Sequence, residues 1–196
     1  DGLRPRRASL PTIRMTAPID FRLTLYPDPV LRKVALDVGS FDDDLRRTVR
    51  AMFALMYASK GVGLAAPQVG LDRRILVLNP SGEADKPEHE LALVNVRILD
   101  RSGPLSIYEE GCLSFPQIYA EVKRPELCKI AAWSPEGAPL EREFDGFTSR
   151  VIQHEYDHLE GVLLVDRMSP ADKQRHKAAL QDLIERYRRS ASAAAK

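Results

Sequence analysis

The sequence predicts an α+β fold, with small antiparallel and mixed sheets packed around a central helix and a further helix at the carboxyl-terminal end. Two observations favour this class. Short runs rich in β-branched and apolar residues lie between residues 74 and 133, separated by clusters of Pro, Gly, Asp and Ser. Segments with helical periodicity lie before and after these runs. Several short strands flanked by separate helices are typical of α+β proteins.

The first helix is predicted between residues 40 and 60. Ser40 is a candidate N-cap, and Asp43 follows three residues later. Gly61 ends the periodic stretch. The apolar positions at helical spacing are Leu45, Val49, Met52, Phe53 and Met56. They indicate an amphipathic helix that packs against the core.

The strand-like runs come next. One surrounds Leu76, and a longer one, L-A-L-V-N-V-R-I-L, begins at Leu91. Two further runs begin at Ile118 and Cys128. Turn-forming clusters such as N-P-S-G and S-P-E-G lie among them and predict separate short strands.

Two helices are predicted after the strands. Helical periodicity returns near Ser149 and holds through His158, with Gly161 just past the end. Ser169 and Pro170 then form a helix start, with Ser as the N-cap and Pro at the first helical position. This last helix is expected to run to about Arg189.

The chain is predicted to hold a single catalytic domain over residues 15–190. Residues 1–14 carry four arginines and two prolines without apolar periodicity, so we expect an unstructured or non-native segment. Its origin stays open between an added segment, a mis-assigned start before Met15 and the stub of a targeting peptide. Residues 191–196, A-S-A-A-A-K, are expected to fray.

Composition excludes several classes of partner. Lys and Arg number 29 and Asp and Glu number 28, so the formal net charge is only +1. No overall field attracts the chain to specific nucleic acid or to an anionic membrane. No apolar stretch approaches the ~20 residues that a membrane span needs. The two cysteines, Cys112 and Cys128, are too few for a disulfide framework and indicate a reducing compartment.

The run H-E-Y-D-H at residues 154–158 is the clearest chemical signal. In a helix, His154 and His158 are one turn apart, so their imidazoles can share a metal ion, while Glu155 projects toward the water that the metal would activate. Val151 and Ile152 precede the motif and Leu159 follows it, so the helix is expected to be buried. Two histidines and a glutamate are costly in such surroundings without a partner such as a metal. The central helix is therefore predicted to bind metal.

The third ligand decides the class of the site, because a catalytic tetrahedral site needs three protein ligands and one open position. The metzincin pattern H-E-x-x-H-x-x-G-x-x-H is broken, since Gly161 is present but Leu164 replaces the last histidine. Glu185 is flanked by arginines and suits a solvated surface better. His89 and His176 lie in charged stretches. A zinc endopeptidase of the HExxH type with a different third ligand stays an alternative.

Two further segments carry candidate groups. Cys112 lies in E-E-G-C-L-S-F-P, and its thiolate would be a strong ligand for zinc or ferrous iron. Residues 60–70, K-G-V-G-L-A-A-P-Q-V-G, surround Gln68 with small residues that let another backbone come close. Taken singly, each segment also fits a structural role: a buried thiol, or a tight connection between a helix and a strand.

Together, G-V-G-L-A-A-P-Q (61–68), E-G-C-L-S (110–114) and H-E-Y-D-H (154–158) resemble the three signature motifs of the peptide deformylases, in the same order. The resemblance extends to Y-P-D-P-V-L-R near residue 26 and covers roughly residues 19–168. The stretch C-L-S-F-P-Q-I-Y-A-E-V looks most like the subgroup of plastids and related bacterial enzymes.

The resemblance implies a metal-dependent hydrolase that removes the N-formyl group from the N-terminal formylmethionine of newly synthesised proteins. Cys112, His154 and His158 would bind one divalent metal, Fe²⁺ in the cell, with Zn²⁺, Ni²⁺ or Co²⁺ as substitutes. Glu155 would be the general base and acid. The Leu113 backbone N–H and the Gln68 side-chain amide would stabilise the oxyanion.

The resemblance also implies where the substrate binds. The methionine side chain would enter an apolar pocket, and the peptide backbone would pair as an added strand near Gly63 and Glu110. Ordinary core packing is the alternative explanation for each pocket position. The pocket positions are Val62, Gly63, Tyr108, Phe147 and Val151.

Partners and location are expectations of the same kind. The substrates would be N-formylmethionyl nascent peptides, and the basic last helix could contact the ribosome, although interleaved acids also fit a solvated face. We expect the bacterial cytoplasm, with a plastid or other organelle stroma as the alternative. A catalytically inactive binding relative is disfavoured because the proposed ligands, Glu155 and Gln68 are all present.

Overall fold

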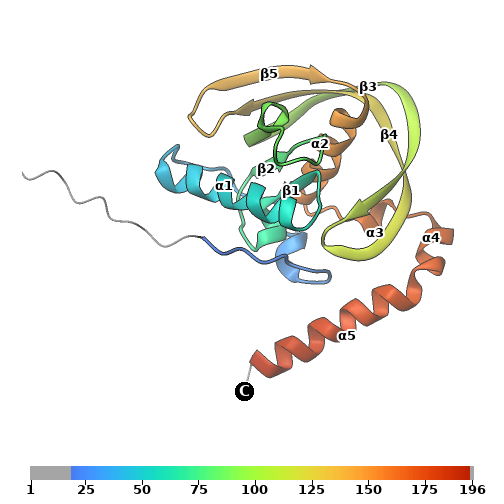
Figure 1. Ribbon diagram of the computed structural model, residues 1–196. Coiled ribbons are helices and arrows are strands. Elements are labelled where there is room, and N and C mark those ends of the chain that lie inside the picture. The colour runs from blue at the N-terminus through green and yellow to red at the C-terminus, as the bar shows by residue number, and fades with distance from the viewer. Residues whose placement is uncertain (1–18, 195–196) are drawn as a thin grey trace, which may run out of the picture.

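The computed structural model describes residues 19–194, so the predictions for residues 1–14 and for the last two residues of the tail lie outside the described part. Five strands form one antiparallel sheet in the order β1-β2-β3-β4-β5. Helices cover it, which confirms the α+β class (Figure 1). The sequence predicted small antiparallel and mixed sheets; the strands instead join in a single antiparallel one. The strands are β1 Gly63–Ala65, β2 Ile75–Leu78, β3 Leu91–Cys112, β4 Phe115–Trp133 and β5 Pro139–Phe144.

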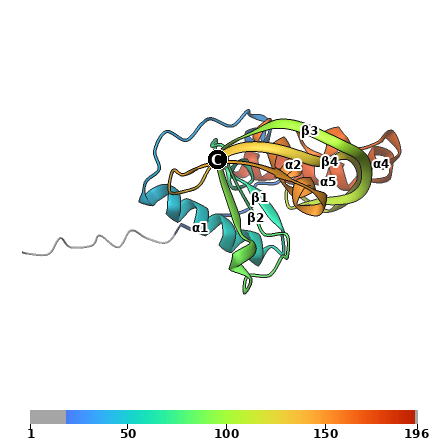
Figure 2. The ribbon, with the colours of Figure 1, turned by 90° about the horizontal axis from the view of Figure 1, so that it is seen from above.

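The short strands β1 and β2 are buried throughout. In β2, Leu76 and Leu78 belong to one core cluster, while Ile75 and Val77 belong to another. Alternate residues of a strand point to opposite faces, so two helices can each cover one side. The helices are α1 (Asp43–Ala58) on one side and α2 (Gly146–Leu159) on the other. Figures 1 and 2 show them on either side of β1 and β2.

The start of α1 differs from the prediction. Asp42, not Ser40, is the N-cap, and its Oδ1 accepts a hydrogen bond from the Leu45 N–H at 3.0 Å. Ser40 lies too early to satisfy a donor of the first turn, because an N-cap side chain reaches only the second or third helical N–H. The predicted apolar face is confirmed, since all five of its side chains are buried.

β3 and β4 form one long curved hairpin, the largest feature of Figure 1. The runs predicted from Ile118 and Cys128 are parts of β4, and the run from Leu91 continues as far as Cys112. Register shifts occur between Ser102 and Leu105 and between Gly111 and Cys112. These irregularities let the hairpin bend without ending the strands.

The last part of the chain is helical. Gly161, at φ +70°, follows α2 in the left-handed conformation, as expected of a residue just past a helix end. Ser169 caps α4 as predicted, but the helix stops and His176 is its C-cap. The next helix continues past Arg189, so the tail expected to fray is helical through Ala194. The remaining helices are α3 Leu164–Arg167, α4 Pro170–Arg175 and α5 Lys177–Ala194, and the 3₁₀ helices are Pro29–Arg32, Ala66–Val69 and Pro87–His89.

A helix that spans a bilayer has to be both long and apolar. Between residues 19 and 194, no helix has both the length and the apolar character that crossing a bilayer requires.

Candidate metal centre and active site

Two elements bring a thiol and two imidazoles together. His154 and His158 lie one turn apart on α2, and Cys112 ends β3. One ligand atom from each residue lies within 4.8 Å of the others, and Cys112 Sγ is 3.2 Å from His158 Nε2. These three residues could hold a metal ion.

The chemistry of the donor set fits a divalent transition metal. One thiolate and two imidazoles are ligands for zinc or ferrous iron. Glu110 Oε2 lies 2.9 Å from His154 Nδ1, which leaves Nε2 for a metal. Burial lowers the pKa of His158 well below its usual value, so this imidazole is held in the neutral form that ligates metals.

The surroundings of His154 favour a positive charge. Burial alone would lower the pKa of this imidazole, but hydrogen bonds to Cys112 and Glu110, together with the charge of Glu155, raise it well above its usual value. A site that stabilises a cation in this way suits a bound metal ion.

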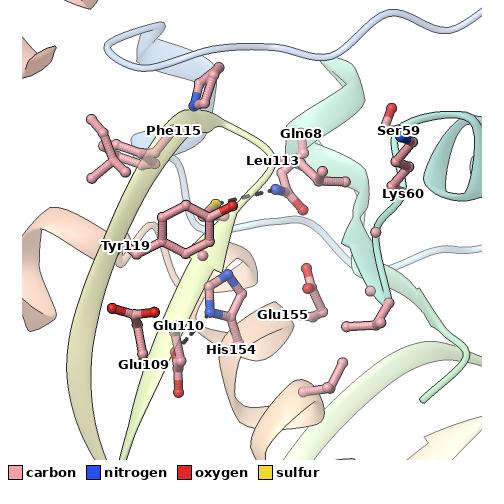
Figure 3. Close-up of a pocket in the computed structure, with 18 of the residues that line it drawn as sticks. Ser59, Lys60, Gln68, Glu109, Glu110, Leu113, Phe115, Tyr119, His154 and Glu155 are labelled. Carbon is pink, nitrogen blue, oxygen red and sulfur yellow. Dashed lines mark hydrogen bonds and ion pairs between the residues drawn. The ribbon is translucent and has the colours of Figure 1, made fainter. Parts of the chain in front are cut away.

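Glu155 is aimed at the same place. Glu155 is only 5% exposed, and its Oε2 atom has no hydrogen-bond partner within the described part of the chain. Burial is the largest cause that raises the pKa of the carboxyl to about 7. A carboxyl with this pKa can both accept and return a proton near neutral pH. Figure 3 shows it facing His154 across the cavity.

Gln68 is oriented by the backbone of Ala65, three residues earlier. Its Oε1 accepts a hydrogen bond from the Ala65 N–H at 2.8 Å, so its Nε2 must point the other way. Nε2 lies 3.3 Å from Ser114 Oγ and 3.6 Å from Cys112 Sγ (Figure 3). An amide donor therefore lies beside the thiol. Leu113 follows Cys112 in the two-residue turn between β3 and β4.

The Glu110 side chain turns inward, into a buried ionic network. It accepts hydrogen bonds from Arg124 and Arg150, and Arg124 also reaches Asp157 Oδ2 at 2.9 Å. Burial by itself would raise the pKa of Glu110, but hydrogen bonds from His154 and Arg124 hold it at about 2. The carboxylate therefore stays charged and can fix His154. The sequence predicted Glu110 for backbone pairing with the substrate and did not predict this role of its side chain.

A cavity of about 760 Å³ opens beside these residues. His158 is buried and is not among its lining residues, whereas every other predicted site residue lines it: Val62, Gly63, Gln68, Tyr108, Glu110, Cys112, Leu113, Phe147, Val151, His154 and Glu155.

Sequence reasoning missed several lining residues. They include Lys60, Glu109, Phe115, Tyr119 and Arg150. Position gives a signal for most of them: Lys60, Glu109 and Phe115 lie in the segments around Gln68 and Cys112. Arg150 precedes His154 by one helical turn and therefore faces the same side. Tyr119 becomes a neighbour of the site through the long hairpin.

Comparison with known proteins identifies the chain's family. The family described as "Polypeptide deformylase" matches residues 21–174. The chain belongs to the peptide deformylase family.

Individual relatives agree with this assignment. The chloroplastic peptide deformylase 1B of Oryza sativa subsp. japonica is 44% identical over 169 residues, which are 86% of this chain and 62% of that protein. The peptide deformylase of Thermotoga maritima is 40% identical over 169 residues, which are 86% of this chain and 99% of that protein. The first relative is thus longer than this chain, and the second is matched over nearly its whole length.

Solved structures have the same fold. A mutant of Arabidopsis thaliana peptide deformylase 1B superposes with a TM-score of 0.83 at 42% identity, covering 86% of this chain and 92% of that one. Plasmodium falciparum peptide deformylase also gives a TM-score of 0.83 at 42% identity, covering 85% and 97%. The chain is thus a metal-dependent hydrolase that removes the N-formyl group from nascent peptides. The alternative of an HExxH zinc endopeptidase is not supported.

Proposed function

We propose that Cys112, His154 and His158 hold one divalent metal ion and that this ion acts with Glu155 on N-formylmethionyl peptides. The observation that carries the proposal is the convergence of these ligand atoms within 4.8 Å, beside a cavity lined by the Glu155 carboxyl. Three protein ligands with an open fourth position are typical of catalytic sites, whereas structural sites are closed by four.

The metal in the cell is proposed to be Fe²⁺, with Zn²⁺, Ni²⁺ or Co²⁺ as substitutes in a purified sample. A thiolate and two imidazoles accept each of these ions, and ferrous iron is typical of the family. When bound, the ion would polarise the formyl carbonyl and lower the pKa of a water molecule.

Glu155 is proposed to move the protons. It accepts a proton from the attacking water as the water oxygen bonds to the formyl carbon. It then gives this proton to the peptide nitrogen as the C–N bond breaks, which yields formate and a free amino terminus. Its pKa of about 7 suits both steps.

Gln68 and Leu113 are proposed to stabilise the oxyanion. The Gln68 Nε2 donor is fixed by the bond that Oε1 accepts from Ala65, so it need not reorganise during the reaction. The Leu113 N–H, one residue after the ligand Cys112, would be the second donor.

The substrate is proposed to bind as an added strand with its methionine side chain in the cavity. β2 pairs with β3 only from Leu91 to Val94, so the edge of β3 beyond Arg97 has no strand neighbour on that side among the described strands. A free edge of this kind can accept an extended peptide near Gly63 and Glu110. The pocket walls would be Val62, Gly63, Tyr108, Phe147 and Val151, all of which line the cavity.

The decisive experiment measures formate release. Protein prepared anaerobically with Fe²⁺ is expected to release formate from a short formyl-Met peptide and to leave the peptide chain intact. The same peptide without its formyl group is the control for proteolysis. Absence of formate from protein carrying one metal ion per chain would contradict the proposal.

Replacing Cys112 with serine is expected to weaken metal binding at least about tenfold, because a hydroxyl is a poor ligand for these soft or borderline ions. The dissociation constant is measured by competition with a chelator. Cys128→Ala is the matched control: this other free thiol lies in the core, 3.8 Å from the Ser149 carbonyl, and its loss should leave metal affinity unchanged. Equal affinity in Cys112→Ser and the parent protein would mean that the ligand set is wrong.

We also propose, as a finer assignment of partner and place, that α5 contacts the ribosome and that the enzyme works in the bacterial cytoplasm. The exposed arginines Arg186, Arg188 and Arg189 support the first part, although Arg186 pairs with Asp182 and Arg189 with Glu185 within the helix. Figure 1 shows α5 extending below the rest of the molecule. Failure of the intact protein to co-sediment with ribosomes at low salt would contradict the proposed ribosome contact.

The compartment is a separate proposal. The free thiols suit a reducing compartment such as the bacterial cytoplasm, and a plastid or other organelle stroma is the alternative.

A further inference from the structure

Arg150 is a buried cation that the reaction described above does not use. It lies on α2 one turn before His154, and its side chain is only 9% exposed. Burying a guanidinium is costly unless its donors are satisfied, so its partners indicate what the position requires.

The guanidinium contacts one face of β3. Nη1 donates to Glu110 Oε1 at 2.7 Å, and Nη2 donates to the Ser106 carbonyl at 3.0 Å and to its Oγ at 2.9 Å. The group also lies 5.6 Å from the centre of the Tyr108 ring. Ser106, Tyr108 and Glu110 are alternate residues, which point to the same side of a strand. Nη1 also donates to the Val122 carbonyl on β4, at 3.0 Å.

Neutralising Glu110 does not by itself require Arg150. Arg124 already binds both oxygens of Glu110, at 2.7 and 2.9 Å, and links that carboxylate to Asp157. The side-chain contacts that Arg150 makes and Arg124 does not are those with Ser106, Tyr108 and the Val122 carbonyl, and the first two lie on β3. Tyr108 lines the cavity, and Ser106 lies two residues earlier on the same strand.

This part of β3 is paired with β4 on one side only. Among the strands of residues 19–194, none neighbours its edge beyond Arg97 on the side away from β4, and its pairing with β4 shifts register between Ser102 and Leu105. A planar group with several fixed donors can hold such a strand at a set distance from a helix.

We propose that Arg150 is a positioning residue that fixes the substrate-binding edge of β3 relative to the metal ligand His154. Through Ser106 and Tyr108 it sets the strand with which the peptide pairs, and through Glu110 it orients the imidazole of His154. One side chain thereby couples peptide binding to metal binding. The inference rests on the proposed function, because it takes His154 as a ligand and β3 as the peptide's partner.

The test compares Arg150→Lys with Arg124→Lys in full-length protein. A lysine keeps the charge but cannot reach Glu110 and Ser106 at once. We expect Arg150→Lys to raise the KM for a formyl-Met peptide about tenfold, as for the loss of a hydrogen bond to a charged group. We expect it also to raise the dissociation constant for Zn²⁺ about tenfold. Arg124→Lys should weaken Zn²⁺ binding but leave KM within about twofold. Arg124 lies opposite Ser106 in the β3–β4 ladder, but its side chain bonds to Glu110 and Asp157, and a substitution leaves the backbone pairing in place.

Ser106→Ala provides a second, milder variant. It removes the Oγ acceptor without burying a new charge, so the fold should be kept. We expect KM to rise about threefold with unchanged Zn²⁺ affinity, since only one of the two Ser106 contacts is lost. This split between KM and metal affinity would not follow from a general loss of stability.

Two results would overturn the proposal. One is an equal KM for Arg150→Lys and Arg124→Lys, and the other is an unchanged KM in Ser106→Ala. Both are measured relative to the parent enzyme, so they are distinct from failure of the proposed function, in which the parent protein itself releases no formate.

Discussion

Replacing Glu155 with alanine is expected to abolish turnover while the metal stays bound. The carboxyl is the only proton carrier proposed for the reaction, and general acid–base catalysis contributes about 10² to 10⁴ in rate. Because Glu155 is not a ligand in the proposed set, we expect kcat to fall at least about 10³-fold with little change in metal content. Formate release and metal analysis on the same sample measure both quantities.

The isosteric variant Glu155→Gln controls for packing. It fills the same buried space but cannot accept a proton, so its kcat should be as low as that of Glu155→Ala. Near-full activity in either variant would refute the role assigned to Glu155. Loss of the metal from both would mean that the carboxylate helps to hold the ion.

Replacing Gly63 with alanine is expected to be nearly as damaging. A Cβ on Gly63 would lie 2.5 Å from Glu155 Oε1 and 2.8 Å from Val151 Cγ1. Both neighbours lie on α2, in the buried wall of the site. Contacts this short cannot be kept, so the Glu155 carboxyl must shift from its present position beside the proposed metal ligands. We expect kcat to fall about 100-fold, because displacement by about 1 Å is costly in preorganised sites. Steady-state kinetics of a folded, metal-loaded sample measures it.

Gly61→Ala is the matched control for this substitution. Its Cβ would meet Leu113 Cδ1 at 2.7 Å, the far end of a flexible, partly buried side chain that can rotate. We therefore expect a much smaller loss of kcat in this variant. Equal losses in the two alanine variants would show that the close approach of Gly63 to Glu155 is not what matters.

The sequence predicts local features of the site well. His154, Glu155 and His158 lie within one helical turn, so their arrangement follows from helix geometry alone. The apolar face of α1 follows from the same periodicity. The N-cap prediction was wrong, because Ser40 and Asp42 are both good capping residues and the chain path between them decides which one caps.

Contacts between distant residues could not be predicted in this way. The network of Glu110, Arg124 and Asp157 joins β3, β4 and α2, and charged residues usually lie at the surface. Nothing in the pattern indicates that these three are buried. The length of β3 was also missed: the predicted run from Leu91 ended at Leu99, yet the strand continues through Gly103 and Pro104 at a shift in register.

The open edge of β3 has a cost as well as a use. An unpaired edge that can receive a peptide can also receive the same edge of another copy, which is the first step of aggregation. Pro104 offers no N–H to such a partner, and Arg101 and Glu109 place exposed charges along this stretch. These residues would discourage pairing between two copies of the chain. The unpaired edge of β3 near the cavity can therefore stay accessible to a peptide even when the protein is concentrated.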